Sequence, residues 1–139
     1  MKKFVSSEAE MMAFAATFSQ QFEPGSLVFL SGDLGAGKTT FCRGFLQGLG
    51  YAGPVVSPTY GLVESYQFGR IIVHHFDLYR LDQPDSLEWL GFRDYLLGDA
   101  ICLVEWPEKA AGLLPAPDIE ISLSYHSKGG RDIEILGGQ

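Results

Sequence analysis

Basic residues are scarce in this sequence. Lysine and arginine together number 10 against 17 aspartates and glutamates, which leaves a formal net charge of −7 at pH 7. These few residues are scattered along the chain, so no basic stripe is available to neutralise a phosphate backbone. The composition argues against direct nucleic-acid binding by the chain alone, whereas an acidic surface suits a basic protein partner.

Cysteine is also rare, and long apolar runs are missing. Cys42 and Cys102 are the only cysteines, so nothing indicates a disulfide framework, and no Cys/His cluster has the spacing of a zinc site. No apolar run approaches the roughly 20 residues needed to cross a membrane. No apolar signal-peptide core follows Lys2 and Lys3. We therefore expect a cytoplasmic protein whose residues 1–139 form a single domain.

What the sequence does contain is a phosphate-binding pattern. An apolar run leads into Gly32-x-x-x-x-Gly37-Lys38-Thr39, the P-loop pattern, and a predicted helix follows. Glycines let backbone N–H groups approach phosphate oxygens, and the helix dipole adds positive potential there. Lys38 is expected to reach the β- and γ-phosphates, and the Thr39 hydroxyl to bind Mg²⁺. The expected nucleotide-binding residues are Asp33, Leu34, Gly35, Ala36, Gly37, Lys38, Thr39 and Thr40. The alternative is a glycine-rich turn that happens to hold a lysine.

The order of the remaining patterns predicts an α/β fold, a P-loop NTPase-like domain. The apolar runs 26–31 and 100–104 are expected to be parallel strands at the centre of a mixed sheet. Strand patterns predict antiparallel hairpins over 62–77 and 118–136. The expected helices are 7–22, 38–49, two short segments within 84–97, and a short helix beginning at Pro107. This order places helices on both faces of the sheet.

Two acidic residues end apolar strands and are candidate metal ligands. Glu105 follows the apolar run 100–104, as a Walker B acid follows its strand, and Asp77 ends the strand-like run 70–77. We expect both carboxylates to converge on Mg²⁺ and Glu105 to orient an attacking water, so Lys38 and Glu105 are the candidate catalytic residues. Thr59 lies in an extended segment where P-loop proteins carry a loop that senses the γ-phosphate. A plain connecting loop is the alternative for that segment.

Several motifs in order resemble the TsaE (YjeE) family of small bacterial P-loop ATPases. They are Gly32–Thr40, Ser57-Pro-Thr-Tyr60, His75-Phe-Asp-Leu-Tyr-Arg80, Glu88-x-Leu-Gly91 and Val104-Glu-Trp-Pro-Glu108. The resemblance runs over roughly residues 5–135 and departs from the family at Tyr60, where phenylalanine is commoner.

The resemblance implies a function that the composition does not. It implies an ATP-binding and ATP-hydrolysing subunit required for threonylcarbamoyladenosine modification at position 37 of tRNA. The partners would be the TsaD and TsaB proteins, which carry the transfer chemistry, and tRNA would be met only indirectly. In the family pattern Lys38 and Thr39 serve the phosphates and Mg²⁺, Asp77 and Glu105 serve the metal and hydrolysis, and Thr59 lies in a switch-like loop.

Two other functions fit a P-loop chain of this length. A small-molecule kinase is one, although the five arginines are scattered and form no lid. A nucleotide-gated binding module whose hydrolysis is incidental is the other. Because a P-loop protein without a supplied arginine finger hydrolyses slowly, low basal turnover does not separate this module from an ATPase subunit.

Overall fold

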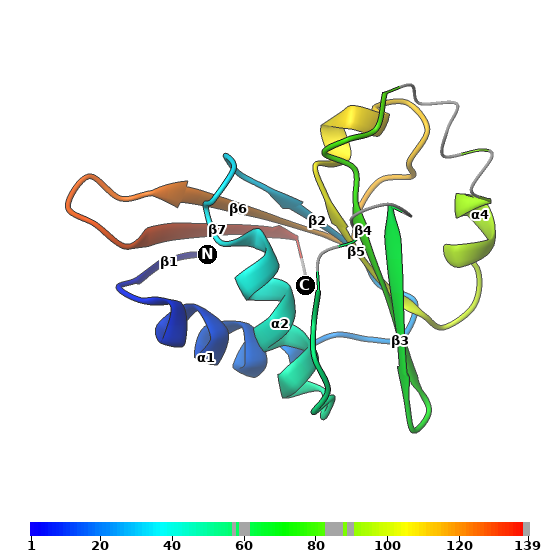
Figure 1. Cartoon of the computed structure of the whole chain (residues 1–139), viewed down its shortest axis with the longest axis horizontal. Coiled ribbons are helices and arrows are strands. Elements are labelled where there is room, and N and C mark those ends of the chain that lie inside the picture. The colour runs from blue at the N-terminus through cyan, green and yellow to red at the C-terminus, as the bar shows by residue number, and fades with distance from the viewer. Residues whose placement is uncertain (57, 59–61, 83–87, 89–90, 138–139) are drawn as a thin grey trace.

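Seven strands form one mixed sheet in the order β1-β7-β6-β2-β5-β4-β3 (Figure 1). The computed structural model describes the chain except residues 57, 59–61, 83–87, 89–90 and 138–139. The strands are β1 (Lys2–Val5), β2 (Leu27–Ser31), β3 (Val63–Phe68), β4 (Ile71–Asp77), β5 (Ile101–Glu105), β6 (Ile119–Tyr125) and β7 (Arg131–Gly137). The helices are α1 (Glu8–Ser19), α2 (Lys38–Gly48), α4 (Phe92–Tyr95) and the 3₁₀ helix η1 (Pro107–Ala110). None of the helices in the described part of the chain is long and apolar enough to span a membrane.

The centre of the sheet is parallel, as predicted, and the outer pairs are antiparallel. β2 pairs in parallel with both β5 and β6, and β4 also pairs in parallel with β5. The predicted hairpins are confirmed as β3–β4 and β6–β7. The histidines of β4 suit an edge strand or a hairpin, and β4 forms a hairpin with β3. It lies inside the sheet, where its apolar residues Val73 and Phe76 are buried on opposite faces. β1, which pairs with β7 at one edge, was not predicted because its four residues carry no alternating pattern.

Helices α1 and α2 cover one face of the sheet. Ser7 caps α1 as its sequence predicts, because its Oγ accepts the Glu10 N–H at 3.1 Å. The two helices approach closely where α2 carries glycine: a Cβ at Gly44 would lie 2.5 Å from the Met12 carbonyl, and one at Gly48 2.4 Å from the Ala16 carbonyl. α1 ends at Ser19 rather than Phe22 because its last turn tightens into i→i+3 hydrogen bonds.

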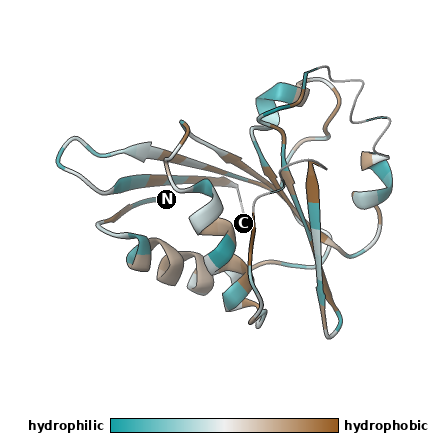
Figure 2. Cartoon of the chain, in the orientation of Figure 1, coloured by the Kyte–Doolittle hydropathy of each residue, from teal (hydrophilic) through white to brown (hydrophobic). Residues whose placement is uncertain are grey.

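The opposite face is covered by α4 and η1, so helical elements lie on both faces, as predicted (Figure 1). α4 follows Gly91, whose φ of 76° marks the predicted break; the first of the two short helices predicted there falls largely outside the described residues. Pro107 begins η1, as predicted. Figure 2 shows hydrophobic colours along the central strands, and the buried apolar residues form two clusters that pack on the sheet.

Candidate nucleotide-binding site

The P-loop, residues 32–37, connects the carboxyl end of β2 to the start of α2 (Figure 1). Gly35 and Gly37 have φ of +83° and +108°, values that an L side chain rarely adopts. Gly37 is the N-cap of α2 and supplies no side-chain cap, so the first turn of α2 presents its backbone N–H groups at the loop. Such a helix start is a site that favours anions.

Lys38 is the first residue of α2, and its side chain is buried beside the loop. Its Nζ donates to the carbonyls of Gly32 at 2.5 Å and Asp33 at 3.0 Å, and lies 4.2 Å from the ring centroid of Trp106. Burial lowers the pKa of Lys38, while the nearby Glu105 and Asp77 carboxylates act in the opposite direction. The lysine is therefore held beside the loop by neutral carbonyls and an aromatic face.

Asp77 and Glu105 lie side by side at the carboxyl ends of two parallel strands. They are paired in the β4–β5 register, and the Thr39 Oγ1 of α2 donates to Glu105 Oε2 at 3.3 Å. Burial raises the pKa of Asp77, and the neighbouring Glu105 raises it further, whereas the Tyr79 N–H that Asp77 accepts lowers it. The site thus holds two adjacent carboxylates and a hydroxyl.

These side chains fit Mg²⁺, the cation that the P-loop pattern implies. Mg²⁺ prefers oxygen ligands, and Thr39, Asp77 and Glu105 supply hydroxyl and carboxylate oxygens near the start of α2. The raised pKa of Asp77 is what a buried carboxylate beside another acid shows, and a divalent cation at this position would lower it. The chemistry of the donors therefore matches the metal predicted from the sequence.

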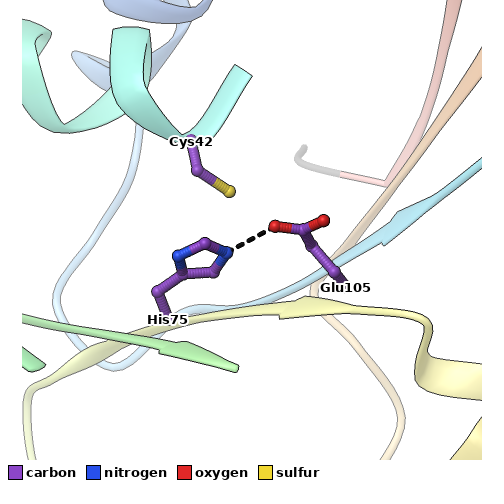
Figure 3. Close-up of side chains that lie close together, drawn as sticks. All are labelled: Cys42, His75 and Glu105. Atoms are coloured by element: carbon purple, nitrogen blue, oxygen red, sulfur yellow. Dashed lines mark hydrogen bonds and ion pairs between the residues drawn. The ribbon is translucent and has the colours of Figure 1, made fainter. Parts of the chain in front are cut away.

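Glu105 is also hydrogen-bonded to a buried histidine (Figure 3). His75 Nε2 lies 2.5 Å from Glu105 Oε2, while His75 Nδ1 has no hydrogen-bond partner in the described part of the chain. The hydrogen bond places a proton between Nε2 and the carboxylate oxygen. His75 therefore fixes the orientation of the Glu105 side chain.

Cys42 lies beside this pair, and the three ligand atoms stand within 4.8 Å of one another (Figure 3). Two ligands of one tetrahedral zinc ion are roughly 3.3 Å apart, given metal–ligand distances of about 2.0 Å. The 2.5 Å between His75 and Glu105 is shorter than that. The cluster therefore has the geometry of a hydrogen bond next to a buried thiol rather than of a metal centre.

Both cysteines are expected to be unreactive in the folded protein. Burial raises the pKa of Cys42 well above its ordinary value and that of Cys102 to about 11, and both side chains are shielded from solvent. Ellman's reagent at pH 8 should detect no thiol in the native chain and two after unfolding. Rapid labelling of either cysteine in the native chain would contradict the packing described here.

Two residues of the hairpin β6–β7 contact the P-loop, and the sequence analysis did not single them out. The Tyr125 hydroxyl donates to the Leu34 carbonyl at 3.0 Å, and Arg131 Nη2 donates to the Gly35 carbonyl at 3.3 Å. Their separation from the P-loop by about ninety residues leaves no local pattern, and only the strand order brings them together. Arg131 also lines a hollow beside the loop with Ser7, Met11 and Thr40.

The structure brings together most of the residues that the sequence singles out. Lys38, Thr39, Asp77 and Glu105 surround the P-loop, whose residues Asp33, Leu34 and Gly35 are exposed while Ala36 is buried. The Thr40 hydroxyl donates to the Glu8 carboxylate of α1 at 3.4 Å, which turns it toward that helix. Thr59 lies outside the described residues, so its predicted role stays a prediction.

Comparison with known proteins gives consistent matches over nearly the whole chain. The family model of the threonylcarbamoyl adenosine biosynthesis protein TsaE matches residues 5–133. The chain is 45% identical over 141 residues to TsaE of Haemophilus influenzae, covering 98% of this chain and 89% of that protein. It is 38% identical over 124 residues to TsaE of Bacillus subtilis, covering 89% and 77% respectively. The crystal structure of Bacillus subtilis YdiB superposes with a TM-score of 0.82 at 32% identity, covering 96% of this chain and 82% of that one.

Proposed function

The chain belongs to the TsaE family of threonylcarbamoyladenosine biosynthesis proteins, and on this basis we propose that it is the ATP-binding and ATP-hydrolysing subunit of that tRNA modification. One observation supports the proposal most: Lys38, Thr39, Asp77 and Glu105 converge beside a P-loop at the start of α2. Together these side chains supply what phosphoryl transfer to water requires: a cation for the phosphates, oxygen ligands for Mg²⁺ and a base for water.

The proposed mechanism assigns one task to each side chain. The N–H groups at the start of α2 bind phosphate oxygens, and Lys38 leaves the Gly32 and Asp33 carbonyls to contact the β- and γ-phosphates. Thr39, Asp77 and Glu105 would hold Mg²⁺, directly or through water, and the metal would offset the negative charge of the phosphates. Glu105, oriented by His75, accepts a hydrogen bond from the attacking water and holds it in line.

We propose that the partners are the TsaD and TsaB proteins, which carry out the transfer chemistry in the cytoplasm while this chain meets tRNA only indirectly. The net charge of −7 supports an indirect role, because the chain has few basic residues to bind tRNA itself. Hydrolysis on a P-loop is slow without a supplied charge at the γ-phosphate, which a partner protein can provide.

The direct test is ATP hydrolysis by the purified chain, alone and with TsaD and TsaB of the same organism, alongside formation of modified tRNA. Stimulated hydrolysis together with many rounds of modification supports the proposal. Stimulation by a metabolite with a phosphorylated product would instead indicate a small-molecule kinase. Modification that continues at full rate when hydrolysis is blocked would indicate a nucleotide-gated binding module.

Asp77→Asn should stabilise the metal-free protein and weaken its response to Mg²⁺. The pKa of Asp77 is raised in the folded state, so the ionised carboxylate costs folding free energy above that pKa, and the cost disappears as the pH falls through it. Asparagine removes the charge and keeps an oxygen for the Tyr79 N–H. At pH 7 the melting temperature should rise without Mg²⁺, and the Mg²⁺ dependence of ATP binding should weaken. An unchanged Mg²⁺ titration would make Asp77 a purely structural residue.

A further inference from the structure

The P-loop is held from outside by two neighbouring side chains of the hairpin β6–β7. Tyr125 donates to the carbonyl of Leu34, and Arg131 donates to the next carbonyl, that of Gly35. The two residues are directly opposite each other in the β6–β7 register, and the Arg131 guanidinium lies 4.3 Å from the Tyr125 ring centroid. Stacked in this way, they form one rigid pair of donors.

Apolar packing does little to fix the shape of the loop at this point. Leu34 is 64% exposed, and Asp33 and Gly35 are exposed as well. Gly35 lacks the side chain that would restrict its backbone, and a Cβ there would lie 2.8 Å from the Tyr125 hydroxyl. Apolar packing therefore cannot hold these peptides, and hydrogen bonds take that role. Lys38 and the Ala36 N–H hold the carbonyls at the start of the loop, and the two hydrogen bonds from the hairpin hold those of Leu34 and Gly35.

Fixing a carbonyl also fixes the next N–H. The peptide group is planar and trans, so its C=O and N–H point in opposite directions. The Leu34 carbonyl belongs to the same peptide as the Gly35 N–H, and the Gly35 carbonyl to the same peptide as the Ala36 N–H. The Leu34 carbonyl drawn toward Tyr125 thus turns the Gly35 N–H away from the hairpin. The Ala36 N–H of the next peptide donates to the Asp33 carbonyl at 3.0 Å, so the Arg131 hydrogen bond to the Gly35 carbonyl holds the peptide that closes this turn of the loop.

We propose that Tyr125 and Arg131 are positioning residues that preset the P-loop backbone for phosphate binding, an inference that rests on the proposed ATP-binding function. They act on the nucleotide through the peptides of Leu34 and Gly35. Arg131 is kept in place by a second hydrogen bond, from its Nη1 to the Gly130 carbonyl at 2.9 Å. Without these donors, the loop must be ordered by the nucleotide itself, and affinity falls.

The first test is Tyr125→Phe, which removes only the hydroxyl of a half-exposed side chain. Loss of one hydrogen bond should raise the dissociation constant for Mg²⁺–ATP about twofold to tenfold. The turnover number at saturating ATP should stay close to wild type, because the loop contacts the phosphates before and during the reaction alike. Tyr51→Phe is the matched control: its hydroxyl donates to another loop carbonyl, that of Pro54, also at 3.0 Å, and its loss should change neither value.

A second readout examines the loop without nucleotide. Hydrogen exchange of a peptide covering residues 32–37 should be faster in Tyr125→Phe and in Arg131→Ala than in wild type. Arg131→Lys keeps a donor, so its affinity for Mg²⁺–ATP should lie between those of Arg131→Ala and wild type. Wild-type affinity and wild-type exchange in both Tyr125→Phe and Arg131→Ala would overturn the inference while leaving ATP binding intact. Failure of the wild-type chain to bind ATP would instead overturn the proposed function.

Discussion

Lys38→Ala is expected to lower ATP turnover by about a hundredfold. Removing one prearranged group that stabilises the negative charge of a transition state typically causes a loss of this size. Lys38 is buried beside the P-loop, with its ammonium on the carbonyls of Gly32 and Asp33 and over the ring of Trp106. Arg131 also places a cation on a loop carbonyl, that of Gly35, but it reaches the loop from the β6–β7 hairpin and not from α2, so it does not take the place of Lys38. Steady-state phosphate release measures the effect.

The control for this prediction is Lys128→Ala, which removes an exposed lysine in the turn between β6 and β7. It should leave turnover unchanged. If the melting temperature of Lys38→Ala is close to that of wild type, the lower turnover comes from the missing side chain at the site and not from unfolding. Unchanged turnover in Lys38→Ala would remove the P-loop from the proposed function.

Glu105→Gln is expected to lower hydrolysis by about a hundredfold while leaving ATP binding within a few-fold of wild type. Positioned general bases contribute roughly 10²–10⁴ in rate, and glutamine cannot accept the proton of water. Its side-chain oxygen can still accept the hydrogen bond from His75 Nε2, so the buried pair persists. Turnover and ATP affinity measured on the same preparation separate the two effects.

Glu105→Ala is the contrasting variant. It leaves the His75 ring buried without its acceptor, which should lower the free energy of unfolding by about 1–3 kcal/mol as well as abolishing hydrolysis. A lower melting temperature for alanine but not for glutamine would confirm the contact with His75. Loss of hydrolysis in both variants, with ATP affinity kept in Glu105→Gln, would confirm the action on water. Hydrolysis by Glu105→Gln within twofold of wild type would contradict the assignment of Glu105.

Much of this site could be predicted from the sequence because its parts are local. The P-loop spacing, the helix that begins at Lys38 and the apolar strand that ends at Glu105 are each encoded by neighbouring residues. The predicted parallel pair β2 and β5 then brings Glu105 to the edge where the loop lies. The proximity of Glu105 to the loop therefore follows from local patterns and this one pairing, whereas that of Asp77 also depends on the pairing of β4 with β5.

The unpredicted parts depend on contacts between distant segments. β4 was predicted only as part of a hairpin, and its further pairing with β5 brings His75 to Glu105. The roles of Tyr125 and Arg131 likewise depend on β6 lying next to β2. The pattern of residues within one strand cannot show such pairings, because they depend on which strands become neighbours in the sheet.

Equilibrium titration of ATP into the purified wild-type chain, with Mg²⁺ and with EDTA, tests the central claim most directly. The claim is that the P-loop, Thr39 and the paired carboxylates of Asp77 and Glu105 form one Mg²⁺–ATP site. The account predicts saturable binding of one ATP per chain that becomes tighter when Mg²⁺ is present. Absence of saturable binding, or the same affinity in Mg²⁺ and in EDTA, would contradict it.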